Sequence, residues 1–161
     1  MHRTKNDLPE GTRTKIVELL NGCLADAIDL MLRSKQAHWN VKGPTFIALH
    51  ELFDKVNEEV EEYVDLIAER ATALGGVAEG TVQAISKRTS LTEYPVGIAD
   101  ARDHLEALSS SLAAFGKSVR RAIDQAMELH DADTADVFTE ISRGIDKHLW
   151  LVEAHLQGTR P

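Results

Sequence analysis

The sequence predicts an all-α protein, a four-helix bundle with a long crossover between its second and third long helices. Three observations support this fold class. Apolar residues recur at spacings of three and four along four long segments, as they do in helices that bury one face. Aromatic residues make up only 5% of the chain, and prolines number four. The 161 residues suit one domain, 1–161, and several long helices in one small domain pack as a bundle.

The first predicted helix spans Pro9–Ala37, after a short flexible tail at 1–8, and the second spans Pro44–Leu74. The apolar stripe of the first consists of Ile16, Leu20, Cys23, Ala27, Met31 and Ser34. Gly43-Pro44 separates the two helices and Gly75-Gly76 ends the second, because glycine and proline terminate helices. The short link predicts an antiparallel hairpin.

The third predicted helix spans Gly97–His130 and the fourth spans Thr134–Leu156, with Asp133 as the N-cap of the fourth. These two helices also form an antiparallel hairpin. The link that precedes them, 75–96, is long for a compact domain. It is therefore expected to cross the bundle and to carry a short helix over Thr81–Ser86.

Gly22, Gly116 and Gly144 lie inside predicted helices. Each costs about 1 kcal/mol relative to alanine. Close approach of a neighbouring helix would explain them, and simple tolerance is an equally good explanation.

Composition and charge argue against several classes of protein. The chain has 18 basic and 26 acidic residues, a net charge of −8, which disfavours a nucleic-acid-binding surface over the whole domain. Cys23 is the sole cysteine and suits a reducing cytosol. No apolar run approaches the roughly 18 residues of a membrane helix, and the charged N-terminus lacks the apolar segment of a secretory signal. We therefore expect a cytoplasmic protein.

The second predicted helix concentrates the negative charge. Residues 44–70 contain eight acidic and two basic side chains, a net charge of −6 out of −8. A solvated helix face is the ordinary explanation of an acidic stripe. Such faces, however, usually place lysines four residues from carboxylates, whereas here like charges stack on one another.

Two pairs of potential metal ligands lie on this helix. His50 and Asp54 are four residues apart, as are Asp65 and Glu69, so each pair shares one face. The centres of the pairs are about 22 Å apart along the axis, which is too far for one metal site. An antiparallel second copy, crossing near Glu59–Val60, brings unlike pairs together, and a twofold axis then makes two identical sites.

His38, at the end of the first helix, can add a fifth ligand. Two imidazoles and three carboxylates suit Fe(II), manganese or zinc better than Cu(I). The chain contains no Glu-x-x-His pair, the motif of di-iron centres inside one bundle. This favours a site between chains, and the alternative that stays open is an acidic surface flank that binds no metal.

At these positions the sequence resembles the Dps family, the mini-ferritins named as DNA-binding proteins from starved cells. The matching segments are His38–Gly43, Leu49–Asp54, Asp65–Arg70, Gly80–Pro95 and Asp146–Trp150. The resemblance covers nearly the whole chain and implies a ferritin-like fold in a hollow dodecamer built from twofold dimers. It also implies ferroxidase activity: the family oxidises Fe(II), usually with H2O2 and otherwise with O2, and stores the ferric mineral.

The resemblance further implies a site with two irons at each dimer interface. His38, His50 and Asp54 come from one subunit in this assignment, and Asp65 and Glu69 from the other. These five residues are both the metal ligands and the catalytic residues. Zinc is a possible substitute, because the same ligand types accept it.

Other residues acquire roles only through the resemblance. Trp39 and Trp150 are expected near the iron centre as redox-active aromatic residues, with packing as the alternative. Asp133 and Asp136 are expected at a pore through which cations enter, within an acidic run that also contains Asp124, Glu128 and Asp131. Capping and solvation are the alternative for this run.

DNA binding is predicted to be weak or absent. Some family members bind DNA through lysine-rich tails, whereas Arg3 and Lys5 are the only basic residues in this tail. The sparse tail argues against one rival interpretation, a nucleoid-associated protein that compacts DNA. A second rival is a helical assembly without functional metal. The remaining histidines are expected mostly at surfaces or interfaces: His104, His130, His148 and His155.

Overall fold

The computed structural model describes residues 1–158, and the last three residues of the predicted domain 1–161 lie outside the described range. Its helices are α1 (Glu10–Asn40), α2 (Phe46–Ala73), α3 (Val82–Arg88), α4 (Ala101–Glu128) and α5 (Ala132–Gln157). Over the described residues, β structure is limited to one isolated bridge between Lys42 and Asp100. The predicted all-α class is therefore confirmed.

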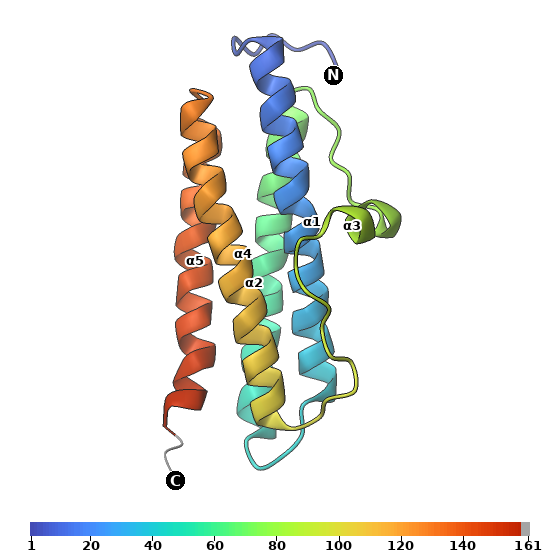
Figure 1. The fold of residues 1–161 in the computed structure, drawn as a ribbon, viewed down its shortest axis with the longest axis vertical. Helices are drawn as coiled ribbons and strands as arrows, with labels where there is room; N and C mark the ends of the chain where they lie inside the picture. Colours follow the sequence, from blue (N-terminus) through green and yellow to red (C-terminus); the bar gives the residue numbers. More distant parts are fainter. Residues whose placement is uncertain (159–161) are drawn as a thin grey trace.

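The four long helices lie side by side in an elongated bundle (Figure 1). α1 packs mainly on α2, and α4 mainly on α5, as the short links predicted. The chain between α2 and α4 runs the length of the bundle along α1 and carries α3 midway (Figure 1). The long crossover with its short helix is thus also confirmed.

The core consists of the predicted apolar stripes. Phe53 of α2, Phe115 of α4 and Phe138 of α5 are fully buried, and each such side chain contributes about 1.5–3 kcal/mol to folding. Cys23 is buried in α1 as predicted. In residues 1–158, no helix combines the length and the apolar character that a membrane span requires.

Two helices of the second hairpin begin elsewhere than predicted. α4 begins at Ala101 rather than Gly97, because the Asp100 side chain caps it by accepting a hydrogen bond from the backbone N of Arg102 at 2.8 Å. The cap of α5 is Asp131 rather than the predicted Asp133, since Asp131 accepts from the backbone N of Thr134 at 3.1 Å. Asp131 also accepts from Arg70 Nη2 of α2 at 2.7 Å, a contact between helices that the sequence does not indicate.

Gly22, Gly116 and Gly144 have different explanations. A Cβ on Gly144 would lie 1.7 Å from the Tyr63 hydroxyl oxygen, and one on Gly116 would lie 3.3 Å from Ile145. A Cβ on Gly22 would meet nothing within 4 Å. Close helix approach therefore explains Gly144, but it does not explain Gly22.

Candidate metal centre

His38 and His50 form a reciprocal pair where α1 ends and α2 begins. Their rings stack with centroids 3.7 Å apart. The Nδ1 atom of each ring lies 2.8 Å from the backbone carbonyl oxygen of the other residue. A carbonyl oxygen only accepts, so each Nδ1 donates its hydrogen, and in the neutral ring each Nε2 keeps its lone pair. Both rings are thereby fixed in the tautomer that binds a metal through Nε2.

The tight link between α1 and α2 creates this pair. Gly43 has φ +118°, a backbone conformation that glycine adopts readily and other residues rarely do. α1 continues to Asn40, so His38 lies in its last turn, opposite the first turn of α2. The Phe46 ring flanks His50 with centroids 5.0 Å apart, which further restricts the His50 ring.

Asp54 lies one turn after His50 and is held by Lys35 of α1. The Lys35 ammonium donates to Asp54 Oδ1, and His38 Nδ1 lies 3.9 Å from the same oxygen. The hydrogen bond from Lys35 holds the pKa of Asp54 below its usual range. Asp54 is therefore ionised and already paired with a cation, so an arriving metal ion must compete with the lysine ammonium.

Sequence reasoning missed Lys35, although one signal was available. Lys35 precedes His38 by three residues, and residues three apart share a helix face. The spacing placed Lys35 beside His38, but its contact with Asp54 depends on how α1 packs against α2.

Asp65 and Glu69 lie further along α2 and are exposed. Neither carboxylate has a hydrogen bond or ion pair within residues 1–158. From Asp54 to Asp65 the helix rises by about 16 Å, so one chain does not bring the two pairs together. In that part of the chain, no group of three or more His, Cys, Asp or Glu side chains is placed to hold a metal ion.

Asp65 and Glu69 border a groove of about 650 Å³ between α2 and α5. Its other charged side chains are Glu59, Glu62, Glu140, Arg143 and Lys147. Carboxylates outnumber cations, so the groove favours cations beside these two predicted ligands.

A hydrogen-bond network that the sequence did not reveal lies at the edge of this groove. Glu59 accepts from the Tyr63 hydroxyl at 2.5 Å and from His148 Nε2 at 2.6 Å. Burial opposes ionisation of Glu59, but the two hydrogen bonds together with the positive charges of His148 and Lys147 outweigh it and lower the pKa of Glu59. Burial and the bond to Glu59 raise the pKa of Tyr63. Gly144 leaves the space that the Tyr63 hydroxyl occupies.

The prediction that most remaining histidines lie at surfaces or interfaces is wrong for two of the four, which are buried within the chain. His104 is fully buried and His148 is 3% exposed, whereas His130 and His155 are exposed. His104 Nδ1 is 2.8 Å from the Tyr94 hydroxyl, and burial lowers its pKa. Both buried histidines bind polar partners from other elements, which helical spacing does not indicate.

Trp39 and Trp150 are not packed within the chain. Their side chains are 67% and 62% exposed, and Trp39 directly follows His38. Exposed indoles of this size are typical of surfaces that another protein covers. Their redox role stays a prediction.

The acidic residues at the junction of α4 and α5 divide into two kinds. Asp131 is 2% exposed and accepts from Arg70 Nη2 at 2.7 Å, so it is a neutralised structural cap. Asp133 and Asp136 are exposed, with Asp133 Oδ2 3.9 Å from Arg70 Nη1. Of the acidic run, these two residues remain candidates for the predicted pore, whose position stays a prediction.

The fold and these residues together define a ferritin-like protein. The family model described as a ferritin-like domain matches residues 17–160, so the chain belongs to that family. Within it, the chain belongs to the Dps proteins. It is 48% identical over 156 residues to the DNA protection during starvation protein of Agrobacterium fabrum, a match that covers 97% of this chain and 96% of the relative.

Solved Dps structures agree closely with this fold. Dps of Mycobacterium smegmatis superposes with a TM-score of 0.93 at 32% identity, covering 99% of this chain and 90% of that one. Dps from Microbacterium arborescens, in its high iron form, gives 0.86 at 36% identity, covering 96% and 98%. The predicted Dps resemblance and ferritin-like fold are thus confirmed.

Proposed function

We propose that this protein is a ferroxidase and iron-storage mini-ferritin. Copies associate as twofold dimers within a hollow dodecamer, oxidise Fe(II) with H2O2 or O2 at shared sites, and retain the ferric product. The observation that carries the proposal is the His38–His50 pair, in which each Nδ1 donates to a backbone carbonyl and each Nε2 keeps its lone pair, with Asp54 Oδ1 3.9 Å from His38 Nδ1. The high iron form of the Microbacterium relative supports iron as the metal.

The two halves of the proposed site come from different chains. His38, His50 and Asp54 form one half, and the unpaired carboxylates of Asp65 and Glu69 of a second copy complete it. Glu69, Asp65 and His38 hold the tighter iron, while His50 and Asp54 hold the weaker one. Because Lys35 already neutralises Asp54, the weaker position is the one where iron competes with a built-in cation.

The chemistry suits substrate iron that arrives as Fe(II) and leaves as Fe(III). Two Fe(II) ions supply the two electrons that split one peroxide O–O bond, so no hydroxyl radical is released. Hydrolysis of the ferric product then releases protons. The name of the Agrobacterium relative refers to protection of DNA, and we propose that this chain protects DNA by removing Fe(II) and peroxide together.

The test is to load apo-protein with Fe(II) without oxygen, add H2O2, and follow ferric absorbance while light scattering reports particle size. We expect rapid oxidation by a particle of dodecamer size. His50→Ala with Asp54→Ala should slow oxidation severely, because one half of the site is lost. Glu51→Gln with Glu58→Gln is the matched control, since both residues are exposed acids of α2 outside the predicted ligand set. Equal rates in the two double variants would contradict the assignment.

A further inference from the structure

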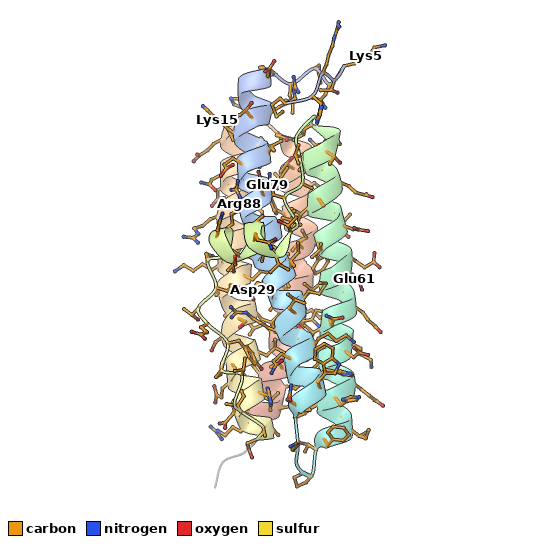
Figure 2. All side chains as sticks on the ribbon, turned by 90° about the vertical axis from the view of Figure 1, so that its right-hand side faces the viewer. Lys5, Lys15, Asp29, Glu61, Glu79 and Arg88 are labelled. Carbon is orange, nitrogen blue, oxygen red and sulfur yellow. The ribbon has the colours of Figure 1, made fainter. Side chains whose placement is uncertain are left out.

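A second groove lies on another part of the molecule, between α1, α4 and the part of the crossover where α3 ends. Its volume is about 490 Å³, within the roughly 300–1,000 Å³ of small-molecule sites. It shares no residue with the groove that Asp65 and Glu69 border. Figure 2 shows two of its residues, Lys15 on α1 and Arg88 on α3 where that helix lies across α1. Nothing in the proposed iron chemistry uses this groove.

One part of the groove's lining is apolar and contains an unexplained glycine. Leu19, Cys23 and Leu129 line it together with Gly22. Glycine is unfavourable inside a helix, and no packed neighbour requires it, because a Cβ on Gly22 would meet nothing within 4 Å. What the missing side chain provides here is open space above α1, in the groove itself.

The uncommitted charges of the groove are both positive. Lys15 and Arg121 have no hydrogen bond or ion pair to any other side chain of residues 1–158. Arg88, by contrast, is bound to Glu18 at 2.7 Å and to Glu79 at 2.8 Å. Two unpaired cations in one groove are unusual in a chain whose net charge is −8.

Asp26, the other carboxylate of the groove besides Glu18, does not pair directly with Lys15 or Arg121. Asp26 is 2% exposed, and it accepts from the backbone N of Ser90 at 2.6 Å and from the Ser90 hydroxyl at 2.8 Å. Its oxygens are therefore directed to the crossover. Ser118 and Gln125 add polar side chains to the lining that have no hydrogen bond within residues 1–158.

We propose that this groove binds a small organic phosphate monoester, with its apolar part over Gly22 and its phosphate on Arg121 and Lys15. A guanidinium donates two parallel hydrogen bonds to phosphate oxygens, and the hydroxyl of Ser118 can donate another. A small ligand fits better than a long polyanion, because only two free cations oppose the repulsion from an acidic protein.

The test is calorimetric titration of the full chain with phenyl phosphate at low salt. We expect saturable binding of one ligand per chain, weaker binding of inorganic phosphate, and no binding of phenol. Arg121→Gln should weaken binding of phenyl phosphate about tenfold or more, as expected for loss of a charge-assisted hydrogen bond. Arg143→Gln is the matched control, because Arg143 is an exposed arginine of α5 without a partner in the described chain.

A second variant tests whether the ligand occupies the open space above Gly22, whereas the Arg121 variant tests the charge. Gly22→Leu places a side chain in the groove at a position where a new Cβ meets no atom within 4 Å, and it should abolish binding while circular dichroism confirms the fold. Absence of saturation, or equal losses in the Arg121 and Arg143 variants, would overturn the proposal. So would Arg121-dependent binding of a short DNA duplex that phenyl phosphate does not displace, since the groove would then be a nucleic-acid contact.

Discussion

His38 and His50 each donate their Nδ1 hydrogen to the backbone carbonyl of the other residue. The fold itself therefore sets the tautomer of both rings, and a metal bound as proposed would meet two oriented Nε2 atoms. Lys35 acts in the opposite direction, because its ammonium is bound to the Asp54 carboxylate that the metal needs. At the residue scale, the two imidazole rings are already oriented as the proposed site requires, whereas the Asp54 carboxylate is already bound to the Lys35 ammonium.

Replacing Lys35 tests this competition. Lys35→Met keeps the length of the side chain and removes the ammonium, so Fe(II) binding measured without oxygen should tighten by several-fold at the weaker position, and the pKa of Asp54 should rise. Lys55→Met is the control, because Lys55 is exposed on α2 and has no partner within the described residues. Unchanged or weaker Fe(II) binding in the Lys35 variant would show that the lysine does not compete.

At the element scale, helix positions could be predicted from the sequence and contacts between helices could not. Apolar spacing located all four long helices because burial of one face is periodic. The start of α4 was misplaced because Asp100 caps the helix through its own side chain. His148 was misjudged because its partner, Glu59, lies on another helix. Spacing also placed His50 and Asp54 correctly on one face. The contact of Lys35 with Asp54 could not be predicted, because it depends on how α1 packs against α2.

Replacing either of two helical glycines with alanine should change the free energy of unfolding, in opposite directions for the two positions. Gly22→Ala should raise the free energy of unfolding by about 0.5–1 kcal/mol, since the new Cβ meets no atom within 4 Å. Gly144→Ala should lower it, because the new Cβ collides with the Tyr63 hydroxyl and breaks the bond to Glu59. Thermal unfolding followed by circular dichroism measures both changes. The same sign in both variants would contradict the packing described for α2 and α5.

The Glu59 network between α2 and α5 should make stability depend on pH. The folded-state pKa of Glu59 is lowered, so its contribution is present above the unfolded pKa of about 4.3 and is lost as pH falls through the folded value. Glu59→Gln should cost about 1 kcal/mol at pH 7, a modest figure because solvent screens this partly exposed group. The difference in unfolding temperature between the wild type and the Glu59→Gln variant should be smaller below pH 4 than at pH 7. A difference that is constant with pH would contradict the role of the carboxylate.

At the scale of the whole molecule, the net charge of −8 is concentrated on α2, where Glu61 projects outward (Figure 2). Acidic side chains there flank the predicted ligands. The same charge repels DNA, and in the proposed dodecamer twelve copies at −8 each would sum to −96. We therefore expect no tight gel shift of duplex DNA at about 150 mM salt. A stable complex at that salt concentration would show that another surface overcomes the repulsion.

The central claim is that each site is shared between two copies, and mixed assemblies test it most directly. One variant carries His50→Ala with Asp54→Ala, and the other carries Asp65→Ala with Glu69→Ala. Each alone should be inactive in peroxide-driven Fe(II) oxidation. Dissociated together at equal amounts and reassembled, they should recover about a quarter of the wild-type rate, because half of the twofold dimers are mixed and each has one intact site. A mixture as inactive as its components would contradict a site built from two chains.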